Sequence, residues 1–324
     1  MTTKIMIPLD RSPEAEAALM PAAAIARARG AEMHLVLIDG NPELPAAAEG
    51  HLDHQEYHDI RMHRLATVLR RTPRFRVTLA IRPGETVPAL AQYARENGID
   101  LIVMTTHGRT GWSRAWLGSV ADELMHATEI PLLLVPHSAL PEPPVVRRVL
   151  VAVEGSGQGR DAALAALDTF DGSGVTITLG QVVSPVPANV DAHFPSALIL
   201  VDSESTTALL DDASRTLNDL AAEVRRGRAA TIDVAVQLAP PIFPVPAVAS
   251  ALVDLATRQH ADVVVLTTHH RGWTRLLASS VADRVLSDTN CMLLIQHTAV
   301  PAEPAAAVTA AAVTVNPIFA GITV

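Results

Sequence analysis

One unit of sequence occurs twice in this chain, and the repetition limits its fold more than any other feature. In the first copy the apolar run 101–104 leads into the glycine-containing segment 105–117, and Gly118-Ser119-Val120 opens a helical pattern. A second copy starts at Thr267 and runs into Ser279-Ser280-Val281. The chain is therefore a duplicated domain, so any fold assigned to the first copy has to suit the second as well.

Short apolar segments alternate with longer helical patterns along both copies. In the first copy we expect strands at residues 4–9, 33–38, 76–81, 101–104 and 131–135, and helices at 14–29, 51–71 and 86–97. In the second copy we expect strands at 148–153, 175–183, 231–238, 263–266 and 291–295, and helices at 158–170, 203–226 and 247–260. Such alternation is typical of parallel sheets with right-handed crossovers.

The expected fold class is α/β, with two tandem Rossmann-like domains. Each is a five-stranded parallel sheet of order 3-2-1-4-5 with helices on both faces. We predict domains at 1–140 and 145–298, joined by a short proline-rich linker, and an Ala-, Pro- and Thr-rich tail at 299–324. The two fifth strands are expected to pair with each other in an intramolecular pseudo-dimer, and a further pairing between chains, giving a homodimer, stays open.

Composition limits the classes of partner. The formal net charge of −9 argues against a nucleic-acid partner, because phosphate backbones attract basic surfaces. No apolar stretch reaches the roughly 20 residues that a membrane helix needs, and the first residues show no signal peptide. We therefore expect a cytoplasmic protein that does not bind membranes. The one cysteine, Cys291, stands in an apolar run and is expected in the core.

A glycine-containing segment between a strand and a helix is suited to binding phosphate. Gly108 and Gly118 have no Cβ, so backbone amides there can approach phosphate oxygens, and the helix dipole favours negative charge. Ser119 with Asp122 three residues later is predicted to cap this helix. Arg109 could pair with a phosphate. In the predicted strand order the carboxylate of Asp10 reaches the same edge of the sheet, where it could accept hydrogen bonds from ribose hydroxyls.

These residues resemble the universal stress protein family. Its nucleotide-binding motif is Gly, two residues, Gly, nine residues, Gly, then Ser or Thr. The chain matches this motif at Gly108, Gly118 and Ser119, and departs from it at Thr105, which replaces the first glycine. A strand that ends in Asp10 fits the family as well. The resemblance covers both copies, roughly residues 1–298, in the tandem form.

The resemblance implies a protein that holds ATP, with or without magnesium, and acts in a stress or metabolic-state response without an established reaction. Pro8 and Asp10 would contact the ribose side, and Leu37 would line the adenine. The glycines and Ser119 would wrap the triphosphate. Thr105, Arg109 and Val120 complete the candidate site, and protein partners stay unknown.

The second copy departs further from the motif. Glu154 stands in place of Asp10, His269 or His270 in place of Gly108, and Ser279 in place of Gly118. Each change adds bulk or moves a carboxylate by about one methylene, where close packing tolerates little. We therefore expect the second copy to be a structural or interaction partner.

Two other kinds of function are weighed against nucleotide sensing. One is an interaction module of the same fold with no nucleotide, and the other is a slow ATPase. No Walker-type loop, nucleophile elbow, HEXXH motif or paired cysteine motif is present to support catalysis. His51, His54 and His58 share a spacing that could bind zinc, but their polar surroundings favour a solvated helix start, so no metal site is predicted.

Overall fold

The structure is a computed structural model of the 324-residue chain. It describes residues 3–10, 12–39, 76–106, 118–136, 146–153, 158–172, 174–184, 203–239, 244–269 and 274–298. The expected helix at 51–71 and the tail at 299–324 lie outside these residues, as do Gly108 and Arg109. No helix within the described ranges is long and apolar enough to cross a membrane.

Strands and helices alternate in both repeats. The elements of the first repeat are β1 (Lys4–Leu9), η1 (Ala15–Ala18), α1 (Leu19–Arg29), β2 (Glu32–Asp39), β3 (Arg76–Pro83), α3 (Thr86–Asn97), β4 (Leu101–Thr105), α4 (Ser119–Ala127) and β5 (Leu132–Val135). Those of the second are β6 (Arg148–Ala152), α5 (Gln158–Phe170), β7 (Thr176–Val183), α6 (Ser203–Val224), β8 (Thr231–Leu238), α7 (Pro244–Arg258), β9 (Val263–His269), α8 (Thr274–Asp288) and β10 (Met292–Thr298).

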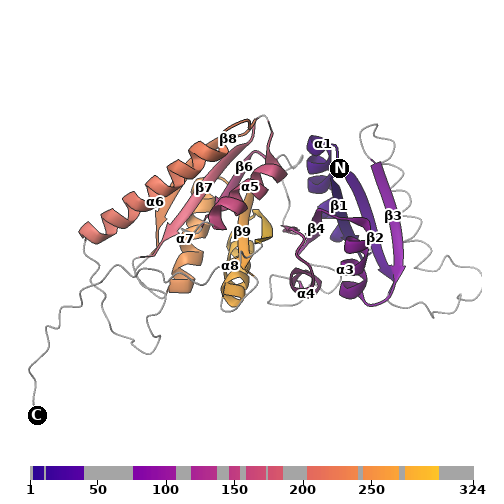
Figure 1. Cartoon of the computed structure of the whole chain (residues 1–324). Helices are drawn as coiled ribbons and strands as arrows, with labels where there is room; N and C mark the ends of the chain where they lie inside the picture. Colours follow the sequence, from indigo (N-terminus) through magenta and orange to yellow (C-terminus); the bar gives the residue numbers. More distant parts are fainter. Residues whose placement is uncertain are drawn as a thin grey trace, which may run out of the picture.

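The strands form one ten-stranded sheet in the order β3-β2-β1-β4-β5-β10-β9-β6-β7-β8. Each half is parallel and has the order 3-2-1-4-5, which confirms the predicted topology. Figure 1 shows the two halves side by side, with the first repeat in indigo and purple and the second in magenta to yellow.

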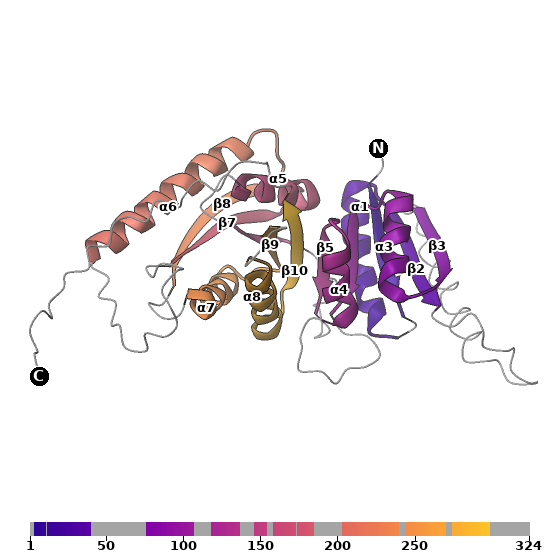
Figure 2. The same cartoon turned by 60° about the horizontal axis from the view of Figure 1, so that its bottom comes forward.

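The two halves join through their fifth strands, as the sequence predicts within one chain. β10 and β5 pair antiparallel, with Leu293, Leu294 and Ile295 opposite Leu134, Leu133 and Leu132. Figure 2 shows β5 and β10 between the two layers of helices. The joint therefore makes the carboxyl ends of the strands point in opposite directions in the two repeats.

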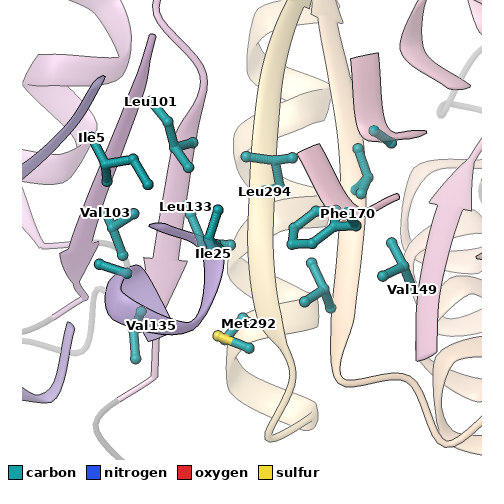
Figure 3. Close-up of a cluster of buried hydrophobic side chains, with 14 of the residues drawn as sticks. Ile5, Ile25, Leu101, Val103, Leu133, Val135, Val149, Phe170, Met292 and Leu294 are labelled. Atoms are coloured by element: carbon teal, nitrogen blue, oxygen red, sulfur yellow. The ribbon is translucent and has the colours of Figure 1, made fainter. Parts of the chain in front are cut away.

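Helices cover both faces of the sheet. One buried cluster lies under α1, α5 and α6, and a second lies under α3, α4, α7 and α8. Each cluster contains residues of both repeats. In Figure 3, Leu133 and Ile25 of the first repeat face Leu294 and Phe170 of the second across the joint. Alanine and branched aliphatic side chains fill most of this core, in line with the 3% aromatic content. Cys291 is buried, as expected.

Most bounds agree with the sequence, but the first helix does not. A single helix over 14–29 was predicted, and the structure begins with the 3-10 turn η1, where Glu16 N donates to Pro13 O and Ala17 N to Glu14 O. The α-helix starts only at Leu19. Pro21 has no N–H to donate to the Ala17 carbonyl, so regular α-helical bonding cannot begin earlier without losing that bond.

Candidate functional site

The first repeat has a topological switch between β1 and β4. Their ladder is short, with Ile5 opposite Leu101 and Met6 opposite Ile102. On its other side β1 stays paired with β2 as far as Leu9, while β4 stays paired with β5 as far as Thr105. Pro8 lies beyond the end of the short ladder and has no N–H that a longer ladder could use. Ligands of open α/β sheets bind outside the strand ends at such a point.

The helix α4 begins directly against the end of β4. Gly118 has extended backbone angles (φ −60°, ψ 148°) and is the N-cap residue, and Asp122 N donates to its carbonyl oxygen at 2.9 Å. A Cβ on Gly118 would overlap the carbonyl oxygen of Thr106. The glycine is therefore needed for this close approach, whatever binds nearby.

The predicted cap by Ser119 is wrong by one residue. Ser119 is the first residue inside α4 and is exposed, and the N-cap residue is Gly118, which has no side chain to cap the helix. The first N–H groups of a helix have no partner within it, so they depend on a cap, water or a ligand. The structure thus places the N-terminus of α4 at the end of β4, with a glycine as its N-cap residue.

Asp10 shapes the turn after β1. Its Oδ1 accepts hydrogen bonds from Ser12 N at 3.0 Å and from Ser12 Oγ at 2.5 Å. Ser12 Oγ in turn accepts from Ala15 N at 3.1 Å, at the start of η1. Asp10 therefore has a structural role in this turn. The sequence indicates a turn with a serine after Asp10, and an aspartate side chain that accepts from the backbone two residues later is a known turn signal.

The other candidate residues come from neighbouring strands. Thr105 ends β4 beside Val135 and is only 7% exposed, so its side chain is packed within the protein. Leu37 lies opposite Leu9 near the end of β2 and has no exposed surface. Pro8, Asp10, Leu37 and Thr105 thus all stand at the carboxyl ends of adjacent strands, and Gly118, Ser119 and Val120 join them through α4.

The second repeat builds the equivalent region differently. β9 continues to His269 and α8 already starts at Thr274, so only residues 270–273 separate them. In the first repeat residues 106–118 separate β4 from α4. Ser279, the counterpart of Gly118, lies inside α8, because this helix already begins at Thr274. Glu154 and His270 lie outside the described residues.

A buried histidine lies on the α3 side of β2. His34 is 4% exposed, and its Nδ1 is 2.8 Å from the hydroxyl of Tyr93. Its Nε2 makes no hydrogen bond and lies 3.5 Å from Glu32 Oε1. Burial lowers the pKa of His34, an effect that the charge of Glu32 opposes. Burial raises the pKa of Tyr93, whose ring is stacked against the guanidinium of Arg82.

Comparison with known proteins identifies the family. The family model described as "Universal stress protein family" matches residues 1–136 and again residues 146–297. The chain belongs to the universal stress protein family. A universal stress protein of Methanocaldococcus jannaschii is 32% identical over 137 residues, which are 41% of this chain and 81% of that protein.

Solved structures show that the tandem arrangement is shared. A universal stress protein from Archaeoglobus fulgidus matches 91% of this chain and 96% of its own, with a TM-score of 0.60 and 14% identity. A Pseudomonas aeruginosa protein described as belonging to the same family matches 91% of this chain and 93% of its own, with a TM-score of 0.61 and 15% identity. At these identities the likeness concerns the fold.

Proposed function

We propose that the first repeat binds an adenine nucleotide, ATP first, and that the protein acts as a non-catalytic sensor of stress or metabolic state. The phosphates would lie at the N-terminus of α4, near Gly118, Ser119 and Val120. The ribose would lie at Asp10 and Pro8, and the adenine beside Leu37. The predicted limits of this domain, residues 1–140, and of the second one, 145–298, with a tail at 299–324, are part of the proposal.

The observation that carries the proposal is the approach of Gly118 to the Thr106 carbonyl. It brings a helix N-terminus whose N-cap residue is a glycine to the end of β4, next to the point where the β1–β4 ladder stops. Helix N–H groups and the helix dipole favour an anion at such a position. Family membership supports the same reading through the matched motif at Gly108, Gly118 and Ser119.

The residues present suit a phosphorylated ligand. Hydrogen bonds to a charged phosphate are worth about 1.5–3 kcal/mol each. Three or four of them, with some adenine burial, would give a micromolar dissociation constant, about −8 kcal/mol. Thr105 stands where the motif has its first glycine, and at 7% exposure it is packed within the protein.

The test is a calorimetric titration of ATP into the full chain and into two variants at one position, Ser119→Glu and Ser119→Gln. Ser119 is exposed in the first turn of α4, so neither change disturbs the core. A carboxylate there interacts favourably with the helix dipole but repels phosphate. We expect Ser119→Glu to weaken ATP binding at least about tenfold, close to 1.4 kcal/mol, while the free protein is as stable as before or more so.

Ser119→Gln is the matched control, because it adds similar bulk without the charge and should weaken binding much less. A folded chain that does not bind ATP at millimolar concentration would contradict the proposal and favour a nucleotide-free interaction module. Equal affinity in wild type and Ser119→Glu would show that the phosphates do not lie at α4. Gly118→Ala is a poor test of binding, because the added Cβ overlaps Thr106 even without a ligand.

A slow ATPase is the second candidate, and no specific observation favours it. Asp10 holds the turn through Ser12 and stands at the end of β1, which in the proposed pose is the ribose end of the nucleotide. Within the described ranges no group of three or more His, Cys, Asp or Glu side chains is arranged to hold a metal ion. Release of phosphate above background that disappears in Ser119→Glu would establish turnover.

A further inference from the structure

Four polar side chains under α3 connect three elements of the first repeat. Thr78 Oγ1 on β3 donates to Glu32 Oε1 on β2 at 2.9 Å, and the same oxygen lies 3.5 Å from His34 Nε2. His34 Nδ1 is 2.8 Å from the hydroxyl of Tyr93 on α3. Figure 2 shows α3 over β2, with β3 at the edge of the sheet. His34 therefore links the helix to the two outer strands.

The surroundings of His34 suit a neutral ring better than a charged one. The ring is buried, and Nε2 makes no hydrogen bond. Of the charged groups that the structure describes nearby, Glu32 on β2 favours the charged ring and Lys4 on β1 opposes it. On β3, the guanidinium of Arg82 lies 5.5 Å from the centroid of the Tyr93 ring. A proton on His34 would thus add a third cation to a region with one carboxylate.

The second repeat has neither ring. Thr178 stands at the position of His34 in the strand register. Leu255 stands at the position of Tyr93, five residues before the left-handed residue that follows each helix. Both replacements are buried. The histidine–tyrosine contact is therefore a feature of the first repeat only, and the second repeat shows that the fold does not need it.

A proton changes the hydrogen bonds that His34 can make. The neutral ring has one donor and one acceptor, whereas the protonated ring has two donors and no acceptor. Nδ1 then has to donate to the Tyr93 oxygen, and Nε2 faces Glu32 Oε1, which already accepts from Thr78. A buried charge is also disfavoured relative to one in water, and burial is the main cause of the lowered pKa of His34. Protonated His34 is therefore more stable in water than under α3.

His34 lies where the fold can open locally. β3 is an edge strand, and only residues 84 and 85 separate it from α3, so the strand and the helix form one unit at the end of the sheet. The strands β1, β4 and β5 and the joint with β10 lie on the other side of β2. Folded proteins open in such units, with a free energy below that of global unfolding. Opening of this unit would bring water to His34 and leave the joint closed.

We propose that His34 is an acid-operated release for the unit formed by β3 and α3. When His34 takes up a proton, this unit opens away from β2 while the second repeat stays closed. The release acts on the face of the sheet under α3, whereas the nucleotide is proposed at the strand ends, so it needs no bound nucleotide.

The experiment is hydrogen exchange of the full chain, followed by mass spectrometry between about pH 5 and pH 7.5. Rates are corrected for the intrinsic pH dependence of exchange. Below about pH 6.5 we expect peptides from residues 76–97 to exchange faster, by up to about tenfold per pH unit, which is the limit for one proton. Peptides from β8 and α7 are the internal control and should keep their protection. Protection of 76–97 that does not fall, or that falls equally in both repeats, would overturn the proposal.

Variants assign the effect to His34. His34→Gln should abolish the acid-dependent loss of protection in β3 and α3. His34→Thr combined with Tyr93→Leu gives the first repeat the residue types of the second and should abolish it as well. His126→Gln is the matched control, because His126 is an exposed histidine on α4, and it should behave as wild type. An acid-dependent loss that persists in His34→Gln would overturn the proposal.

Discussion

Gly118 lies against the carbonyl oxygen of Thr106, so closely that a Cβ on residue 118 would overlap that oxygen. The contact joins the end of β4 to the start of α4 across residues 107–117. A glycine of the nucleotide-binding motif is thus required by the backbone itself, before any ligand is considered. A glycine at this position can serve the backbone contact or the binding of a ligand, and the sequence alone does not distinguish these two reasons.

Gly118→Ala should destabilise the protein without nucleotide. Since the overlap involves backbone on both sides, relief requires α4 or the end of β4 to move, and we expect a loss of about 1–3 kcal/mol in the free energy of unfolding. Urea denaturation measures it. Gly172→Ala is the control, because a Cβ there meets only ordinary van der Waals contacts. Equal stability of the two variants would contradict the close approach.

His260→Gly should stabilise the protein. His260 follows α7 with φ +49°, and its counterpart after α3, Gly98, has φ +61°. The left-handed conformation is unfavourable for a residue with a Cβ, and His260 is exposed, so little packing is lost. We expect a gain of about 0.5–1 kcal/mol. The reverse change, Gly98→His, should cost a similar amount, and a loss of stability in His260→Gly would refute this account.

The stability of the first repeat should depend on pH through His34. The folded chain holds the His34 pKa below its usual value because the side chain is buried beside Tyr93; the charge of Glu32 opposes this effect and that of Lys4 adds to it. As the pH falls below about 6.5, the unfolded chain takes up a proton that folded His34 resists, so the free energy of unfolding decreases until the folded pKa is passed.

His34→Gln should flatten this dependence, since glutamine keeps a hydrogen-bonding side chain beside Tyr93 but does not titrate. The measurement is the free energy of unfolding between about pH 5 and pH 7.5 in both proteins. The other histidines contribute equally to both curves and cancel in the difference. Parallel curves would mean that His34 titrates normally in the folded state.

The joint between the repeats should be energetically coupled. Leu133 and Leu294 are opposite each other in the β5–β10 pair, and neither has exposed surface. Each change to alanine should cost about 2–5 kcal/mol. The double variant should differ from the sum by about 0.5 kcal/mol or more, because the two cavities adjoin.

Leu133→Ala combined with Leu179→Ala is the control for this cycle. Leu179 lies on β7, four strands from β5, and is equally buried. These two changes should therefore add. Additivity of Leu133→Ala with Leu294→Ala as well would show that the joint does not bind the two repeats into one core.

Much of the fold could be predicted because the duplication gives each strand and helix two copies in the sequence, and the pattern of one copy supports that of the other. The helices 86–97 and 158–170 and the strand 231–238 have the bounds expected from their patterns. The predicted start of the first helix was wrong because Pro21 has no N–H for regular α-helical hydrogen bonding. The extension of β9 and α8 toward each other was not foreseen either, because hydrophobic periodicity does not report where a loop shortens.

The candidate site, too, could be predicted from the sequence only in part. The sequence indicated Asp10 and Gly118 by motif and strand order. It could not show that Ser12 donates two hydrogen bonds to Asp10 Oδ1, or that Gly118 lies against the Thr106 carbonyl. In the second repeat it showed what was missing from the motif.

By itself the sequence determined the class of fold, the duplication and the strand order, because hydrophobic periodicity and connection lengths are local properties of the chain. Only the tertiary structure decided which backbone atoms approach closely and which polar atoms are buried without partners. These outcomes depend on packing between segments far apart in the chain, where a fraction of an ångström separates a contact from an overlap.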